Sequence, residues 1–177
     1  MIWVGYAAAA LGAIGVAVLG IGAMLPQNHV ATGSAMVAAP ADKVAVLVRE
    51  VGRYPEWRSR VSAIEVRQRG IDDVEYDEVS GGDRIRFRLT EPEHARRFES
   101  AILDKTLPFG GRWTILLEPE GVTTRLTITE HGIVRNPLFR FVSKLLIGHD
   151  STIRTYLADL RKAVASLAER RSTPAAR

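Results

Sequence analysis

His149 lies where an imidazole could transfer protons within an apolar setting. It is four residues from Leu145 and four from Ile153, in a stretch whose other apolar residues recur every three or four positions. This spacing places the imidazole on the apolar face of a helix, where it could hydrogen-bond a ligand or carry a proton. The structural alternative is a histidine bonded to a backbone carbonyl beside a kink at Gly148.

Glu130 is the second candidate for proton transfer. It continues the alternation of Leu126 and Ile128, so a strand would turn all three side chains to one face. A carboxylate there could act as an acid or a base at the end of a cavity. The structural alternative is a salt bridge with Arg140 or another base, because buried carboxylates are generally paired. The neighbouring His131 would point to the opposite face.

An arginine could bring positive charge to the same interior. Arg96, Phe98, Ser100 and Ile102 alternate along one expected strand. If they face inward, Arg96 is a buried cation that requires an anionic ligand or a carboxylate. In the opposite register Arg97 takes that place, and the sequence leaves both registers open.

Other kinds of site lack support in the sequence. The chain has no cysteine, and its histidines at positions 29, 94, 131 and 149 lack the spacing of metal ligands. It has neither a glycine-rich phosphate loop nor a nucleophile elbow. Arg84, Arg86 and Arg88 alternate with Ile85, Phe87 and Leu89, which separates the arginines from the aromatic ring and argues against nucleic-acid binding. We therefore expect no metal, no cofactor and no nucleic-acid partner.

The element that must position His149 is a long helix from about Pro137 to about Glu169. Pro137 suits its first turn, and Asn136 suits its cap. The helix needs a sheet on which to bury its apolar stripe. The preceding segment supplies a first strand (residues 29–37), two short helices (42–51 and 53–57) and about six strands, with a hairpin at Ser80-Gly81-Gly82-Asp83. We therefore expect an α+β fold with an antiparallel meander.

The N-terminal segment predicts a membrane anchor. Ile2 to Leu25 are 24 positions without a charge, which exceeds the ~20 residues needed to span a hydrocarbon core. No basic residue precedes the run, which favours an uncleaved transmembrane helix over a signal peptide. Lys43 is the first basic residue after it, which tips the orientation slightly toward a cytoplasmic domain.

Composition supports one globular domain after this segment. The chain has 177 residues, 46% hydrophobic and 25% charged, with a net charge of +4. We expect an anchor at residues 1–26, one domain at 27–169 and a flexible basic tail at 170–177. The oligomeric state is left open.

The sequence resembles the SRPBCC superfamily of START-like and polyketide cyclase/dehydrase-like proteins. The resemblance rests on Met36–Val44 followed by Val51–Trp57, with its Tyr-Pro-x-Trp turn. Gly111–Trp113, Thr124–Glu130 and Asn136–Leu138 also resemble this family. It implies a helix-grip fold, in which a curved antiparallel sheet holds the C-terminal helix with a hydrophobic cavity between them. The residues expected at that cavity are Ile85, Phe87, Leu89, Arg96, Phe98, Trp113, Ile115, Leu126, Ile128, Val142, Leu145, His149, Ile153 and Leu157.

These features favour binding over catalysis. The first expectation is a membrane-anchored protein that binds, transports or presents a hydrophobic molecule such as a lipid, quinone or polyketide. The alternative is a polyketide cyclase or dehydratase that uses His149 or Glu130 as a proton carrier. A third alternative is an interaction domain with a filled core. The absence of a catalytic motif leaves enzyme activity open and weighs against it.

Overall fold

The fold is α+β, with a seven-stranded antiparallel sheet and a C-terminal helix, as in a helix-grip fold. The computed structural model describes residues 2–142 and 150–172. The strands lie in the order β1-β7-β6-β5-β4-β3-β2. Strands β2 to β7 form a meander, and β1 is added beside β7 as an edge strand. The strands are β1 (Asn28–Val37), β2 (Val61–Arg69), β3 (Asp73–Ser80), β4 (Asp83–Glu93), β5 (Arg97–Ile102), β6 (Phe109–Glu120) and β7 (Thr123–Val134).

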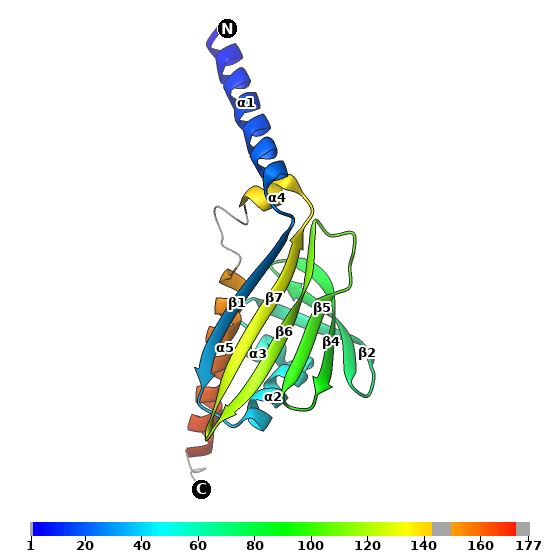
Figure 1. The fold of residues 1–177 in the computed structure, drawn as a ribbon, viewed down its shortest axis with the longest axis vertical. Coiled ribbons are helices and arrows are strands. Elements are labelled where there is room, and N and C mark those ends of the chain that lie inside the picture. The colour runs from blue at the N-terminus through cyan, green and yellow to red at the C-terminus, as the bar shows by residue number, and fades with distance from the viewer. Residues whose placement is uncertain (1, 143–149, 173–177) are drawn as a thin grey trace.

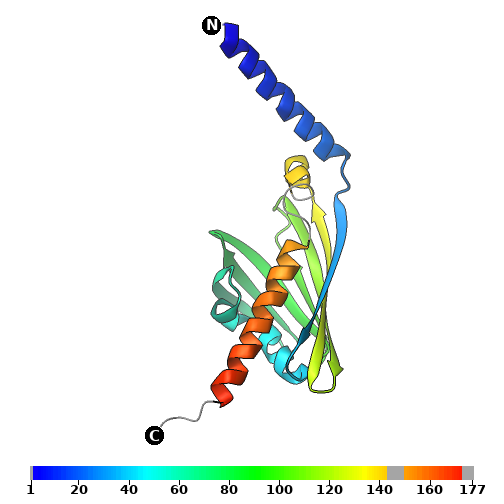
Figure 2. The same ribbon diagram turned by 90° about the vertical axis from the view of Figure 1, so that its left-hand side faces the viewer.

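The helices occupy one face and one end of this sheet (Figures 1 and 2). The N-terminal helix α1 (Ile2–Met24) projects from the end of the sheet where α4 (Pro137–Val142) also lies. The short elements α2 (Ala41–Arg49), η1 (Val51–Arg53) and α3 (Tyr54–Trp57) connect β1 to β2, and α5 (Ser151–Ser172) crosses the concave face. The expected order of one strand, two short helices, six strands and a C-terminal helix is confirmed.

The loop sequence specifies the hairpin between β3 and β4. Gly81 and Gly82 both have positive φ, at 60° and 92°, and Ser80 pairs with Asp83 across this two-residue loop. A two-residue hairpin loop needs such angles, which glycine adopts without strain. The expected hairpin is therefore confirmed.

The expected single helix from Pro137 to Glu169 is wrong. The described residues there form two helices, α4 and α5, with Asp150 in a turn before α5. The sequence gives a reason for the interruption, because the stripe positions Leu145 and Ile153 are eight residues apart and Gly148, a poor helix former, lies between them. Leu145 and His149 themselves lie outside the described residues. The expected cap is confirmed, because Oδ1 of Asn136 accepts hydrogen bonds from the backbone N–H groups of Leu138 and Phe139.

Two contacts fix α5 on the sheet. On one side, a Cβ atom at Gly33 in β1 would lie only 2.7 Å from Cγ2 of Ile153, so glycine allows the helix to approach the strand closely. On the other side, Oδ2 of buried Asp159 accepts hydrogen bonds from the backbone N–H and the hydroxyl of Ser59, both at 2.8 Å. The helix is thereby held between β1 and the α3–β2 connection.

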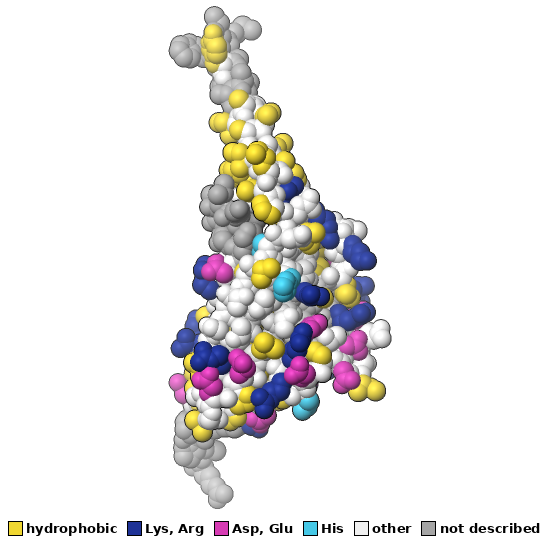
Figure 3. Space-filling model, viewed as in Figure 1, with side chains coloured by type: hydrophobic (Ala, Val, Ile, Leu, Met, Phe, Trp, Pro, Cys, Tyr) yellow, Lys and Arg dark blue, Asp and Glu magenta, His cyan; other side chains and the backbone are white. Residues whose placement is uncertain are grey.

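The N-terminal helix contacts the domain through α4. Arg140 is buried and donates to the backbone oxygens of Ala23 and Leu25, where α1 ends, which complements the partial negative charge of a helix C-terminus. Hydrophobic side chains are exposed along α1, whereas charged side chains are scattered over the visible face of the domain (Figure 3). Over residues 2–142 and 150–172, no helix combines the length and apolarity that crossing a membrane requires, so the expected transmembrane anchor at residues 1–26 is not supported.

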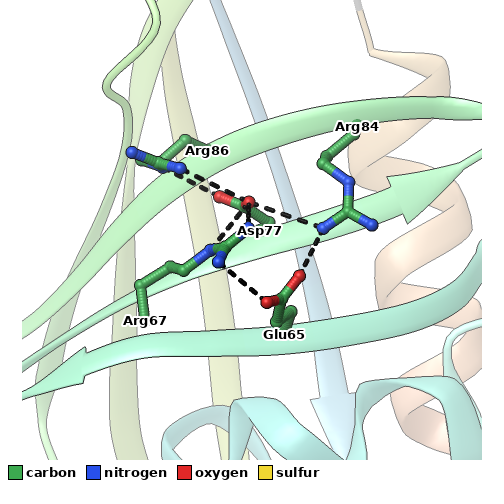
Figure 4. A network of polar contacts seen from close by, with 5 residues as sticks. All are labelled: Glu65, Arg67, Asp77, Arg84 and Arg86. Atoms are coloured by element: carbon green, nitrogen blue, oxygen red, sulfur yellow. Dashed lines mark hydrogen bonds and ion pairs between the residues drawn. The ribbon is translucent and has the colours of Figure 1, made fainter.

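An ion-pair network covers the outer face of β2, β3 and β4 (Figure 4). Asp77 is buried, and its carboxylate accepts hydrogen bonds from Nε of Arg86 at 2.8 Å and from Nη2 of Arg67 at 2.7 Å. Arg84 bridges the carboxylates of Glu65 and Asp77, at 2.5 and 3.6 Å. The arginines of β4 therefore face solvent, and two of them also neutralise the buried carboxylate of Asp77.

We predict that this network stabilises the fold only while Asp77 is ionised. The hydrogen bond from Arg86 lowers the pKa of Asp77 from 3.8 to about 2, despite the opposing effect of burial. Because the folded pKa lies below the unfolded one, the contribution is complete above about pH 4 and is lost as the pH falls toward 2. Asp77→Asn should therefore lower the free energy of unfolding at pH 7 by on the order of 2 kcal/mol.

Urea denaturation of the wild type and of Asp77→Asn between pH 7 and pH 2 measures this contribution. The two curves of stability against pH should converge below about pH 3. A difference that stays constant down to pH 2 would show that the ionised carboxylate is not what the network stabilises.

Candidate functional site

A cavity of about 430 Å³ lies between the concave face of the sheet and α5. Its walls come from the strand ends that lie at the α4 end of the domain. These are the first residues of β1, β4 and β6 and the last residues of β3, β5 and β7. Ser151 and Thr152 at the start of α5, together with Phe139 of α4, line the same end. The volume is within the range of small-molecule sites in proteins.

The cavity exists because side chains fill only the far end of the concave face. There, core residues of β4 to β7 pack with α2 and with the middle of α5, as Leu117, Leu126, Val48 and Leu160 do. Toward α4, the inner-face positions carry residues that leave a hollow, including Ser100 and the glycine pair Gly110 and Gly111. A filled core, the third expectation from the sequence, does not fit this arrangement.

Aromatic rings make the deeper wall. Tyr76 stacks on Phe87 with ring centroids 5.7 Å apart, and Tyr54 meets Tyr76 edge to face at 6.0 Å. Tyr156 of α5 lies edge to face with Trp113 at 5.6 Å. Phe87 and Trp113 are only partly buried, so the wall offers aromatic surface that suits flat apolar or aromatic ligands.

A buried ion pair, Arg58 with Glu78, lies among these rings. Nη1 of Arg58 is 2.6 Å from Oε2 of Glu78, and both side chains are mostly buried. The guanidinium also lies over the rings of Tyr54 and Tyr156, with its central carbon 4.9 and 5.3 Å from the ring centroids. Burial lowers the pKa of Arg58, but the electrostatic effects of the Glu78 carboxylate and of the three neighbouring tyrosines together outweigh it, so the pKa is raised and the residue stays charged.

Three tyrosines around the pair stay protonated. Burial raises the pKa of Tyr156 to about 12 and raises the pKa values of Tyr54 and Tyr76 further. The Tyr54 hydroxyl donates to the backbone oxygen of Val48 at 2.8 Å. The deeper wall therefore offers neutral phenols and one compensated cation, which suits an apolar ligand with a few polar atoms.

A second pair of ionisable groups, His29 and Glu130, lies nearer the α4 end. Nε2 of His29 in β1 is 3.4 Å from Oε1 of Glu130 in β7, and both residues line the cavity. The imidazole lies against Gly132, where a Cβ atom would be 2.1 Å from Cε1 of His29. Glu130 therefore faces inward as its strand parity predicts, and its partner in the structure is a histidine from the first strand.

The other residues expected at the cavity are divided between its wall and the core. Ile85, Phe87, Trp113 and Ile115 line the cavity. The core, by contrast, holds Leu89, Phe98, Leu126, Ile128, Ile153 and Leu157. Val142 ends α4 and is not among the described residues that line the cavity. Leu145 and His149 lie outside the described residues.

Arg96 does not reach the cavity. It is exposed in the turn before β5, which starts at Arg97. A register shift between Thr90 and Glu93 and the left-handed backbone of Ala95, with φ of 55°, take Arg96 out of the alternation of the strand. Arg97 is half-buried and pairs with Glu99 of its own strand at 2.7 Å.

Sequence reasoning missed His29, Arg58, Glu78 and Tyr156 as cavity residues. Tyr156 had a signal, since it lies three residues after Ile153 in the apolar stripe of α5. His29 and Arg58 had none, because each meets its carboxylate only through strand pairing and the path of the chain between elements.

Comparisons with known proteins agree with this architecture. Residues 28–170 match a family described as "Polyketide cyclase / dehydrase and lipid transport". A START superfamily protein from Mycobacterium smegmatis has a TM-score of 0.62 at 16% identity, over 78% of this chain and 99% of that chain. Zhui aromatase/cyclase from Streptomyces sp. R1128 has a TM-score of 0.62 at 21% identity, over 84% and 98%.

A plant enzyme has the same fold. Norcoclaurine synthase from Thalictrum flavum, solved with a transition-state analogue, has a TM-score of 0.62 at 16% identity, over 80% of this chain and 96% of that chain. No curated protein matches the sequence. Identities this low establish a shared fold, and function must be argued from the site itself.

We predict that Arg58 and Glu78 depend on each other. Arg58→Met should lower the free energy of unfolding by about 3 kcal/mol, because it leaves the Glu78 carboxylate buried without a counter-charge. The double variant Arg58→Met with Glu78→Leu should recover part of this loss, since no buried charge remains. Urea denaturation measures both effects, and a single variant as stable as the wild type would show that the ion pair is not a buried constraint.

Proposed function

Because the chain belongs to the polyketide cyclase/dehydrase and lipid transport family, we propose that it binds an apolar or aromatic small molecule in the cavity between the sheet and α5. The observation that carries the proposal is the 430 Å³ cavity with its wall of Tyr76, Phe87, Trp113 and Tyr156. Ligands in such sites bury apolar surface, and a few polar groups fix their orientation. Lipids, quinones and polyketides are the classes that fit this description.

Polar groups in the wall set limits on the ligand. The cavity is also lined by Arg60 and Arg112, both at exposed positions, whereas Arg58 and Glu78 neutralise each other in the deeper wall. A fully charged ligand would lose its hydration there without gaining a counter-ion. A neutral apolar body with one or two oxygen atoms is the better match, because phenol and guanidinium groups can donate to oxygen.

A cyclase- or dehydratase-type enzyme is the second candidate. Such chemistry needs a proton carrier inside the cavity. The pairing of Glu130 with His29, 3.4 Å apart in the cavity wall, is the observation in its favour. Zhui aromatase/cyclase and norcoclaurine synthase have enzymatic activity on this fold, but each shares at most 21% of its sequence with this chain.

Membrane attachment through residues 1–26 remains a prediction from the sequence. Its support is the run of 24 uncharged positions from Ile2 to Leu25. The full chain should sediment with membranes and resist extraction by salt and by alkali, and a chain that begins at Gln27 should stay in the supernatant. Recovery of the full chain in the supernatant without detergent would contradict the prediction.

We predict that filling the cavity weakens ligand binding without unfolding the protein. N-phenyl-1-naphthylamine, a neutral apolar fluorophore, should bind the wild type saturably. Ile85→Trp places an indole at a lining position and should weaken binding at least about tenfold, a loss of about 1.4 kcal/mol. Fluorescence titration, with the probe excited directly, measures the dissociation constant.

A matched control is Leu116→Trp, which adds the same indole at an exposed position of β6 outside the cavity lining. This variant should bind the probe as the wild type does. Circular dichroism should show that both variants are folded. Absence of saturable binding to the wild type, or equal binding by both variants, would contradict the proposed function.

A further inference from the structure

We propose that the α4 end of the domain faces a lipid bilayer, and that a neutral ligand passes there directly between the bilayer and the cavity. This inference rests on the proposed binding function and adds the surface from which the ligand comes. We define the rim as five exposed residues at this end of the domain, which are Lys105, Arg112, Arg135, Leu138 and Phe139.

Helix α4 joins the cavity to the N-terminal helix. Phe139 lines the cavity and is 47% exposed, so the cavity wall reaches the molecular surface at this helix. Gly22 of α1 packs so closely on the backbone of Pro137 that a Cβ atom would clash with its carbonyl oxygen. Arg140 of α4 donates hydrogen bonds to backbone oxygens at the end of α1. The base of α1 is therefore held beside the cavity wall (Figures 1 and 2).

Large apolar side chains are exposed on every side of α1. They are Leu11, Ile14, Val16, Leu19, Ile21 and Met24. With about 3.6 residues per turn, these positions point in all directions around the helix axis. A groove on a partner protein would cover one face of such a helix, whereas lipid surrounds it completely. A bilayer is therefore the occupant that matches α1, and the rim lies where α1 meets the domain.

The rim also carries positive charge that the protein leaves uncompensated. Within the described part of the chain, Lys105, Arg112 and Arg135 form no ion pair with a carboxylate. Asp104, the acidic residue beside Lys105, instead accepts hydrogen bonds from Thr106. The three arginines of β4, by contrast, are all paired with carboxylates.

The position of this charge indicates the kind of bilayer. Figure 3 shows Lys and Arg side chains on the domain beside the base of α1. Basic residues next to exposed apolar surface are the combination that binds membranes containing anionic lipids. The rim therefore complements a bilayer with a negative surface, and Leu138 and Phe139 supply its apolar contacts.

The arrangement suits the ligand that the cavity favours. A neutral apolar molecule partitions into lipid, and its passage through water would expose apolar surface. Where the cavity wall reaches the surface beside lipid, the molecule can move from hydrocarbon to the aromatic wall without entering bulk water. The ligand class is then a neutral, lipid-soluble molecule with a polar end, such as a long-chain alcohol or a quinone.

Site-specific labels test the orientation of the rim. The chain has no cysteine, so a single-cysteine variant carries a fluorophore at one chosen position. Leu138→Cys places the label on the rim, at a residue that is 46% exposed. The matched Val122→Cys places it in the turn between β6 and β7, at the opposite end of the sheet, where Val122 is 81% exposed.

The labelled full chain is combined with vesicles of phosphatidylcholine and phosphatidylglycerol that contain a nitroxide-labelled lipid. The label at position 138 should lose most of its fluorescence, because nitroxide quenches at short range. The label at position 122 should keep its fluorescence.

A photoreactive ligand tests the passage into the cavity. Hexadecanol that carries a diazirine group is neutral and stays in the bilayer, and peptide mass spectrometry maps its cross-links on the full chain. We expect cross-links on the cavity-lining strands, which Ile85→Trp should remove and Leu116→Trp should preserve. Leu138→Asp should lower them about tenfold, because a carboxylate opposes contact with lipid, and the matched Val122→Asp should not. Circular dichroism verifies that each variant is folded.

The outcomes separate this inference from the proposed function. Equal quenching at positions 138 and 122, cross-links confined to α1, or full cross-linking in Leu138→Asp would each overturn the bilayer-facing rim. So would a full chain that does not associate with the vesicles. In each case, saturable binding of N-phenyl-1-naphthylamine would leave the proposed function in place. Failure of both this probe and the photoreactive alcohol to bind would overturn the proposed function, and the inference with it.

Discussion

The contact between α5 and β1 at Gly33 fixes the position of α5 on the sheet, and the cavity depends on that position. Without a side chain at residue 33, Ile153 packs directly against the strand backbone. Asp159 ties the other side of the helix to Ser59, so α5 cannot slide across the concave face. Held in this position, the helix fills the far end of the sheet with apolar side chains, and the end beside α4 remains hollow.

The hollow contains two pairs of opposite charge in different environments. Arg58 and Glu78 lie deep among three protonated tyrosines, where removal of either partner would leave a buried charge. His29 and Glu130 lie nearer the α4 end, and the Glu130 side chain is more exposed than that of Glu78. We infer that the first pair holds the shape of the wall, and that the second joins the edge strand β1 to β7 beside the cavity.

Local patterns in the sequence were enough to predict most of the fold. The hairpin at Gly81 and Gly82, the cap at Asn136 and the inward face of Ile85 and Phe87 each depend on residues within one or two elements, so periodicity and turn chemistry find them. The turn at Asp150 before α5 had a signal too, since Gly148 precedes it in the sequence.

The site was harder to predict because it depends on long-range pairing. Glu130 faces the cavity as its parity indicates, but its partner His29 is brought beside it only when β1 adds to β7 at the edge of the meander. Arg96 lies outside the alternation because a bulge and the left-handed Ala95 precede its strand. Parity also could not tell cavity positions from core positions such as Phe98, because that depends on where α5 and α2 lie on the sheet.

The most direct test of this account is native mass spectrometry of the full chain purified from a bacterial host, with extraction and identification of anything bound. The account predicts that the cavity carries, or takes up from a panel of apolar compounds, one neutral molecule per chain, with a mass and polarity that fit a lipid, quinone or polyketide. A folded chain that stays empty at every ligand concentration offered would contradict it.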